Sequence, residues 1–385
     1  MIVLGLKNFI KSPPLWLNGS RLGLLCNQAS VDENFVHSRD LIRHCGGQLT
    51  CLFSPQHGFF AEKQDNMVES GHYLDNELPV FSLYGSSRRP DAAMFERFDV
   101  LLIDLPDAGT RVYTFMSTMA YCLEEAARLQ KKVVVLDRPN PLGGHLVEGN
   151  ILRDDCRSFV GLFPLPMRHG LTFGELALFI NDHLPVSAEL EVVPMEGWKR
   201  RQFYPDTGLP WVYPTPNLPT FQSALVYPGQ VIWEGTNISE GRGTTMPFEL
   251  CGAPFIRHDE VLKCLAADNL PGCVLRPVCF EPVANKWANE VCIGFQLHIT
   301  DWHIFRPYRT ALALLRAVML TCKEDFCLKE PPYEYEYERM PLDLILGDKG
   351  LKDELAAGCE IAGLEESWQP ELREFMAARR KYLLY

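Results

Sequence analysis

The first half of the chain alternates short apolar segments with longer amphipathic ones. Near-continuous apolar runs are typical of parallel strands covered on both faces, and they occur at 21–26, 49–53, 80–84, 100–104 and 132–137. The spacing of apolar residues predicts helices at 36–44 and 113–130, and Thr172-Phe-Gly-Glu175 predicts a capping box that begins a helix extending to Asp182. This alternation predicts an α/β fold with a doubly wound parallel sheet.

The second half has a different pattern. A proline-rich passage, 209–219, breaks helices and favours extended backbone, so we predict that it connects two domains. Beyond it, strand-like runs at 273–276 and 292–299 mix with helical patterns at 308–321 and near 370–380. The sequence therefore predicts a sheet domain over 1–226 and a smaller α+β domain over 227–385.

Polar residues follow three of the predicted strands. They form the clusters Pro55-Gln-His-Gly58, Asp104 with Asp107, and Asp137-Arg-Pro-Asn140. Because parallel sheets bind ligands beyond the carboxyl ends of their strands, we expect all three clusters at one edge of the sheet. Taken singly, each residue could equally cap a helix or hold a loop.

A second polar stretch, 234–249, carries three glycines and lies between two apolar segments. Its hydrogen-bonding side chains suit a polyhydroxylated or anionic ligand, and they include Asn237, Ser239, Arg242 and Thr244. The alternative is a turn-rich surface loop. If this loop faces the edge of the sheet, the ligand site lies between the domains.

Composition excludes several kinds of partner. The formal net charge of −12, with no clustered basic run, argues against nucleic acid and anionic membrane surfaces. The thirteen cysteines contain no CxxC pair and are odd in number, which favours a reducing compartment over a disulfide framework or a zinc site. Since the apolar run at the N-terminus is short for a signal peptide, we expect a cytoplasmic protein.

The common cofactor motifs are missing from the sequence. No GxGxxG follows a predicted strand, and neither a Walker A motif nor HExxH occurs. We therefore expect neither a cofactor nor a metal ion.

The same motifs carry a family resemblance that runs from about Gly23 to the end of the chain. They are the three polar clusters, of which the second extends as Asp104-x-x-Asp-x-Gly-x-Arg111. His169-Gly170, Pro216-Asn-Leu-Pro219 and the stretch from Glu234 to Thr245 complete the set. The chain resembles the exo-β-N-acetylmuramidase NamZ family. The resemblance implies a Rossmann-like first domain, a smaller second domain, and a glycosidase that removes N-acetylmuramic acid from the non-reducing ends of peptidoglycan fragments.

Several residues acquire expected roles from this resemblance. The anionic lactyl group of the sugar needs a cation, and Arg111, Arg138 and Arg242 are the candidates because guanidinium binds carboxylate through two hydrogen bonds. Arg138 could instead form a salt bridge with another residue at the edge of the sheet. The remaining expected sugar contacts are Asn140, Asn237, Ser239 and Thr244.

One position departs from the family pattern. The resemblance implies a catalytic glutamate at position 56, where this chain has Gln56, and an amide cannot donate the proton that the leaving oxygen needs. Glu62 could supply the acid from the same loop. Alternatively, Asp107 or Glu234 could serve while the acetamido group of the substrate attacks, or the protein could bind a muramic acid derivative without cleaving it.

Three further points complete the sequence analysis. His57 is either a hydrogen-bonding partner in the site or a strand-end histidine that satisfies backbone groups. Family members are commonly exported, whereas we expect this chain to process imported or recycled muropeptides in the cytoplasm. A Rossmann-like sugar or nucleotide-sugar transferase is the alternative from another class, and the missing phosphate-binding glycine loop speaks against it.

Overall fold

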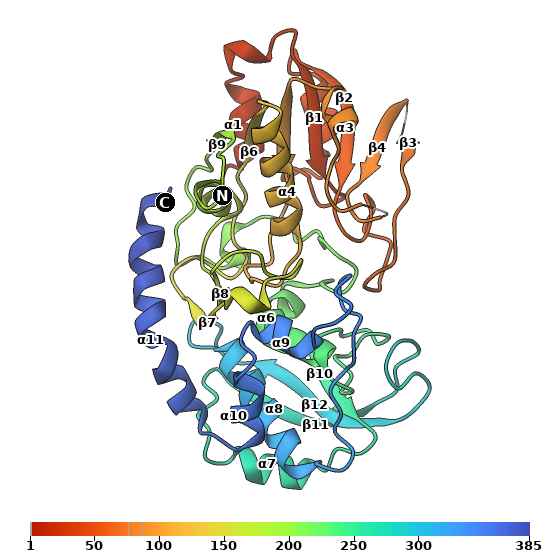
Figure 1. The fold of residues 1–385 in the computed structure, drawn as a ribbon, viewed down its shortest axis with the longest axis vertical. Helices are drawn as coiled ribbons and strands as arrows, with labels where there is room; N and C mark the ends of the chain where they lie inside the picture. Colours follow the sequence, from red (N-terminus) through yellow and green to blue (C-terminus); the bar gives the residue numbers. More distant parts are fainter. Residues whose placement is uncertain (1, 76, 86) are drawn as a thin grey trace.

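The chain folds into two lobes stacked along the long axis of the molecule (Figure 1). The computed structural model describes residues 2–75, 77–85 and 87–385. The first lobe is built on a seven-stranded sheet and the second on a three-stranded sheet. None of the helices in these described ranges is long and apolar enough to cross a membrane.

The larger sheet has the strand order β3-β4-β2-β1-β5-β6-β9. Its strands are β1 (Arg21–Cys26), β2 (Gln48–Ser54), β3 (Tyr73–Asp75), β4 (Leu78–Ser82), β5 (Val100–Asp104), β6 (Lys132–Leu136) and β9 (Glu189–Val193). Neighbouring strands are parallel, except that β3 runs antiparallel to β4. The order changes direction between β1 and β5, which is the position where open sheets of this kind bind ligands.

Helices cover both faces of this sheet, so the predicted doubly wound α/β fold is confirmed. Alternate residues of one strand point to opposite faces, and Leu24 packs in one apolar cluster while Leu25 packs in another. Helices α1 (Gly5–Lys11) and α2 (Ser38–Arg43) contribute to the first cluster, and α3 (Ala92–Phe95), α4 (Phe115–Arg128) and α5 (Phe173–Asp182) to the second. The predicted capping box at Thr172 is present.

The second lobe surrounds an antiparallel sheet in the order β10-β12-β11. Its strands are β10 (Leu250–Ala253), β11 (Cys273–Phe280) and β12 (Cys292–Ile299). Its helices are α6 (Phe221–Gln230), α7 (His258–Leu265), α8 (Pro307–Thr321), α9 (Pro341–Leu346), α10 (Leu351–Ala356) and α11 (Ile361–Ala378). A short antiparallel hairpin, β7 (Glu148–Ile151) with β8 (Pro166–Arg168), comes between β6 and β9 along the chain.

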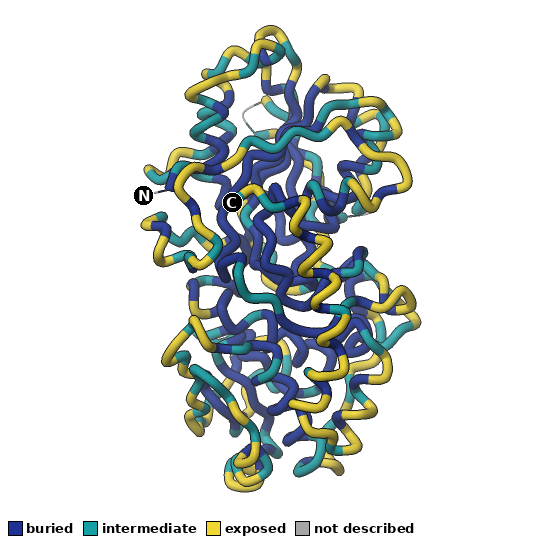
Figure 2. The backbone as a smooth tube through the Cα atoms, turned by 90° about the vertical axis from the view of Figure 1, so that its left-hand side faces the viewer, coloured by how far each residue is buried: buried dark blue, intermediate teal, exposed yellow. Residues whose placement is uncertain are grey.

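One apolar core joins the lobes. The larger buried cluster includes residues from β1 to the C-terminal turn, and Figure 2 shows buried backbone running through both lobes. Helix α11 leads the chain back to the first lobe, where Arg379 donates to the carbonyl oxygens of His169 and Gly170 at 3.2 and 3.1 Å. The Tyr385 hydroxyl donates to Asp137 at 2.8 Å. The last residues therefore fix the second lobe against the first.

Candidate functional site

The interdomain pocket lies where the carboxyl end of β2 faces the second lobe. We use this name for a pocket of about 400 Å³ lined by Gln56, His57, Asn66, Val112, Tyr113, Thr114, Val160, Thr215, Asn217, Leu218, Tyr227, Glu234, Arg242, Phe248, Tyr333 and Glu334. It brings together residues predicted from the strand-end cluster and from the polar stretch of the second lobe. This stretch thus meets the condition under which the sequence analysis placed a site between the domains.

Glu234 is buried in this pocket and held by three partners. Its Oε1 accepts from Arg242 at 2.6 Å, and its Oε2 accepts from Tyr333 at 2.7 Å and from Asn66 at 2.9 Å. Burial alone would raise the pKa of Glu234. The charge of Arg242, together with the hydrogen bonds from Arg242, Tyr333 and Asn66, outweighs burial and lowers the pKa below the usual glutamate value. Glu234 is therefore ionised at neutral pH.

Arg242 itself is fully engaged. Besides Glu234, its guanidinium contacts Glu240 at 3.1 Å and donates to the Gln64 carbonyl at 2.8 Å. The close packing of the surrounding loop depends on glycine, since Gly243 has φ +77° and a Cβ there would lie 2.4 Å from the Ala284 carbonyl oxygen. At this position glycine serves the packing of the loop against its own lobe.

Gln56 is 3% exposed and makes hydrogen bonds with both ends of its amide. The Nε2 atom donates to Glu334 at 2.8 Å and to the Tyr84 hydroxyl at 3.1 Å, while Oε1 accepts from Thr114. The amide therefore has its Nε2 toward Glu334 and its Oε1 toward Thr114.

Glu334 is the functional candidate that the sequence analysis missed. It is 4% exposed, and its Oε2 accepts from the Tyr84 hydroxyl at 2.6 Å. Burial raises its pKa to about 7, although the hydrogen bonds from Tyr84 and Gln56 act in the opposite direction. The alternating run from Tyr333 to Glu338 holds three glutamates at equivalent spacing, so the sequence gives no signal that separates Glu334 from Glu336 or Glu338.

His57 satisfies a backbone group, as in the second of the two alternatives given for it, and it does so at the pocket wall. Its ring lines the interdomain pocket, and its Nδ1 lies 2.6 Å from the carbonyl oxygen of Lys63, to which it must donate. Burial lowers the pKa of His57 to about 4, so the ring is neutral near pH 7. The Nε2 atom is then an acceptor.

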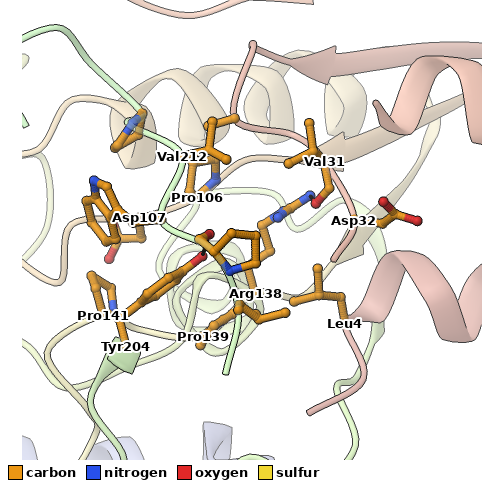
Figure 3. A pocket seen from close by; sticks show the side chains of 15 residues that line it. Leu4, Val31, Asp32, Pro106, Asp107, Arg138, Pro139, Pro141, Tyr204 and Val212 are labelled. Atoms are coloured by element: carbon orange, nitrogen blue, oxygen red, sulfur yellow. Dashed lines mark hydrogen bonds between the residues drawn. The ribbon is translucent and has the colours of Figure 1, made fainter. Parts of the chain in front are cut away.

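A second pocket, the rim pocket, is lined by Asp107, Arg138 and Pro139 from the other two strand-end clusters (Figure 3). It measures about 510 Å³ and is lined by Leu4, Ala29, Val31, Asp32, Pro106, Asp107, Arg138, Pro139, Pro141, Tyr204, Leu209, Pro210, Trp211, Val212 and Pro214. Arg138 forms two hydrogen bonds to Asp104, at 2.6 and 2.9 Å, which is the salt bridge considered as an alternative. Asp107 accepts from the Gly109 amide at 2.8 Å and lies 3.3 Å from His169 Nε2.

The proline-rich passage separates the two pockets. Its 209–214 part lines the rim pocket, and Thr215, Asn217 and Leu218 line the interdomain pocket. The passage is fixed at both sides, because Asn27 donates to the Pro214 carbonyl at 2.8 Å and Asn217 donates to the Gln64 carbonyl at 2.7 Å. Gln56 and His57 thus line one cavity, whereas Asp107 and Arg138 line the other.

The remaining predicted residues lie outside the interdomain pocket. Arg111 is fully buried and donates to four backbone carbonyls, and Asn140 donates to the Leu171 carbonyl at 2.8 Å and accepts from the Leu142 amide at 2.9 Å. Glu62 is exposed beside Gly58. In the polar stretch, Asn237 bridges to the backbone of Asp325 and Cys327, and the hydroxyls of Ser239 and Thr244 form turns with Gly241.

Comparison with known proteins agrees with the arrangement in two lobes. Residues 22–222 match the model described as exo-β-N-acetylmuramidase NamZ, N-terminal, and residues 225–385 match its C-terminal counterpart. The peptidoglycan β-N-acetylmuramidase NamZ of Bacillus subtilis (strain 168) is 40% identical over 372 residues, which cover 96% of this chain and 88% of that protein.

Two solved structures from Bacteroides fragilis NCTC 9343, both of DUF1343 family proteins, have the same fold. One is 31% identical with a TM-score of 0.89 and the other 26% identical with a TM-score of 0.79, and each match covers 100% of this chain and 99% of the other. Over both of its domains, the chain belongs to the exo-β-N-acetylmuramidase NamZ family of glycosidases.

Proposed function

We propose that this protein is an exo-acting β-N-acetylmuramidase that removes N-acetylmuramic acid from the non-reducing ends of peptidoglycan fragments. The relative from Bacillus subtilis is named as a peptidoglycan β-N-acetylmuramidase. The observation that carries the proposal is Glu234, a buried carboxylate held ionised by Arg242 in a pocket between the two lobes.

An ionised carboxylate in this position suits glycoside cleavage. Positive charge develops at the anomeric carbon as the bond to the leaving oxygen breaks, and a fixed negative charge stabilises it. The pocket also offers groups for sugar hydroxyls, because the buried Tyr113 hydroxyl lines it without a hydrogen-bond partner among the described residues. Asn217 and Thr215 add further donors and acceptors along the wall.

The amide of Gln56 favours a second candidate function, which is sugar binding without hydrolysis. Gln56 occupies the position where the resemblance places the catalytic acid, and both ends of its amide are occupied by hydrogen bonds within the protein. An amide in this position has no proton to give to a leaving oxygen.

Release of chromophore from a β-N-acetylmuramic acid glycoside tests the proposal. We expect wild-type protein to release it and Glu234→Gln to lose at least about 100-fold in kcat, since the fixed negative charge is gone. Glu62→Gln should retain activity, because Glu62 is exposed outside the pocket; a collapse of this variant would instead make Glu62 the acid.

Thermal shift separates the alternatives if the wild type is inert. Stabilisation by N-acetylmuramic acid without hydrolysis would identify a binding protein. Stabilisation by nucleotide sugars alone would favour the transferase.

We also propose that the protein acts in the cytoplasm, on imported or recycled fragments. Its thirteen cysteines are free thiols, and several of them, including Cys279, Cys327 and Cys359, are exposed. Free exposed thiols persist in a reducing compartment. Detection of the protein in the culture medium or the cell-wall fraction, and not in the cytosol, would refute this placement.

A further inference from the structure

We propose that Glu334 is the general acid that protonates the leaving glycosidic oxygen, and that Gln56 and Tyr84 are positioning residues that hold its carboxyl group in the interdomain pocket. This inference rests on the proposed function. It answers how a chain with an amide at position 56 can still cleave a glycoside.

The contacts of Glu334 place its carboxyl group at the first lobe although its backbone belongs to the second. Glu334 lies between α8 and α9, and its two carboxylate oxygens reach Gln56 at 2.8 Å and Tyr84 at 2.6 Å. All three side chains are buried, and Gln56 and Glu334 both line the interdomain pocket. The carboxyl group therefore lies beside the residue at the position that the resemblance assigns to the acid.

The backbone around Glu334 is in an unfavourable conformation. Glu334 and Tyr335 have φ of +49° and +64°. These values lie in the left-handed region, which residues other than glycine and asparagine rarely adopt. Such conformations persist where the surroundings enforce them, and they concentrate at functional sites. Here the strained turn directs Glu334 inward, while Tyr335 packs against Tyr84 with ring centroids 5.4 Å apart.

Gln56 suits a positioning role better than a carboxylate would. Its Nε2 provides a neutral hydrogen-bond donor to Glu334, and Thr114 fixes its other end. A second ionised carboxylate at this distance would repel Glu334. The amide thus holds the acid without competing for its proton.

The surroundings of Glu334 keep a proton available near neutral pH. Burial raises its pKa to about 7. The titratable or charged groups around it are Tyr84 and Arg88 from the first lobe, and Glu234, Arg242, Tyr333 and Tyr335 from the second. Glu234 raises the pKa of Glu334, and Arg242 lowers it. Two carboxyl groups with pKa values shifted in opposite directions match the division between acid and ionised carboxylate in glycosidases.

The proposed step conserves atoms and charge. As the bond between the anomeric carbon and the leaving oxygen breaks, its electron pair goes to that oxygen, which takes the proton of Glu334. Over the complete turnover, one water gives its hydroxyl to the anomeric carbon and its proton to the Glu334 carboxylate. Glu334 is thereby restored, and one water is consumed.

Two substrates with different leaving groups test the acid role. A 2,4-dinitrophenyl β-glycoside of N-acetylmuramic acid has a leaving group that departs without a proton, whereas a disaccharide needs one. For Glu334→Gln we expect the disaccharide rate to fall by about 100-fold or more, with a much smaller fall for the dinitrophenyl glycoside. Glu338→Gln, on the same loop but exposed, should match the wild type on both.

The pH profile tests the positioning role of Tyr84. Tyr84→Phe removes a hydrogen bond that lowers the pKa of Glu334, so the alkaline limb of kcat should move to higher pH, whereas a purely structural role would lower the rate without moving it. Equal losses on both substrates, or wild-type rates, for a folded Glu334→Gln would overturn the acid role alone. A wild type inert on both substrates would overturn the proposed function together with this inference.

Discussion

At the scale of single residues, the burial of Glu334 couples its chemistry to the stability of the fold. An unfolded chain ionises this carboxyl group near the usual glutamate value of 4.5, whereas the folded protein holds its proton up to about pH 7. The stabilising contribution of Glu334 is therefore fully present below pH 4.5 and is lost as the pH rises through 7. A catalytic acid that burial keeps protonated should therefore lower the stability of the fold at a pH above its pKa.

The variant Glu334→Gln should reveal this pH-dependent loss of stability, because glutamine does not titrate. We expect the free energy of unfolding of Glu334→Gln to rise relative to that of the wild type as the pH increases from 5 to 8. Urea unfolding at several pH values gives the difference directly, with Glu338→Gln as the exposed control on the same loop. A difference that stays constant with pH would mean that Glu334 is ionised in the folded protein throughout.

The sequence alone predicted some residues of the site but not others. Gln56 and His57 follow a buried strand, and Glu234 and Arg242 lie in a stretch rich in glycine and polar residues, so local pattern marked them. Glu334 is 278 positions from Gln56, and only the packing of the lobes brings them together. Arg111 and Asn140 occur in equally suggestive motifs, yet their side chains satisfy backbone groups in the structure.

At the scale of elements, burial decided which predictions succeeded. Strands β1, β2, β5 and β6 are buried on both faces, and the sequence located each within one or two residues. The sequence of strand β9, Glu-Leu-Glu-Val-Val, contains no continuous apolar run of this kind, and the strand was not predicted. Helix α11 begins at Ile361 and not near Pro370, because Pro370 is accommodated inside the helix that it was expected to begin.

The proline-rich passage is an element whose importance for the site can be measured. Asn217 is 8% exposed and joins this passage to the Gln64 carbonyl on the loop that carries His57, Asn66 and Met67. We expect Asn217→Ala to lower kcat/KM by about tenfold, since one hydrogen bond of about 1–2 kcal/mol holds the wall of the pocket in place. Steady-state kinetics on the chromogenic glycoside provides the measurement.

A matched variant lies on the other side of the same passage. Gln28 donates to the Tyr213 carbonyl at 3.2 Å in an exposed contact, away from the interdomain pocket. Gln28→Ala should therefore leave kcat/KM close to that of the wild type. Equal effects of the two variants would show that the passage acts as a whole and not through Asn217.

At the scale of the whole molecule, Arg111 connects the two lobes. Its guanidinium donates to the carbonyl oxygens of Asn150 and Leu165 in the first lobe and of Ile345 and Leu346 in the second, at 2.8 to 3.1 Å. The side chain is fully buried, and burial lowers its pKa. An arginine that the sequence suggests as a sugar ligand is thus placed as a clamp between backbone segments.

Replacing Arg111 distinguishes a clamp from a ligand. Arg111→Ala leaves four buried carbonyl oxygens without this donor, so we expect the free energy of unfolding to fall by about 3–5 kcal/mol. Arg153 also bridges the lobes, through Asp348 and Glu371, but it is 46% exposed, so Arg153→Ala should cost less than about 1 kcal/mol. Urea unfolding measures both. If Arg111→Ala instead raised KM with unchanged stability, Arg111 would be a substrate ligand, and the lobes would be held together by their other contacts and their shared apolar core.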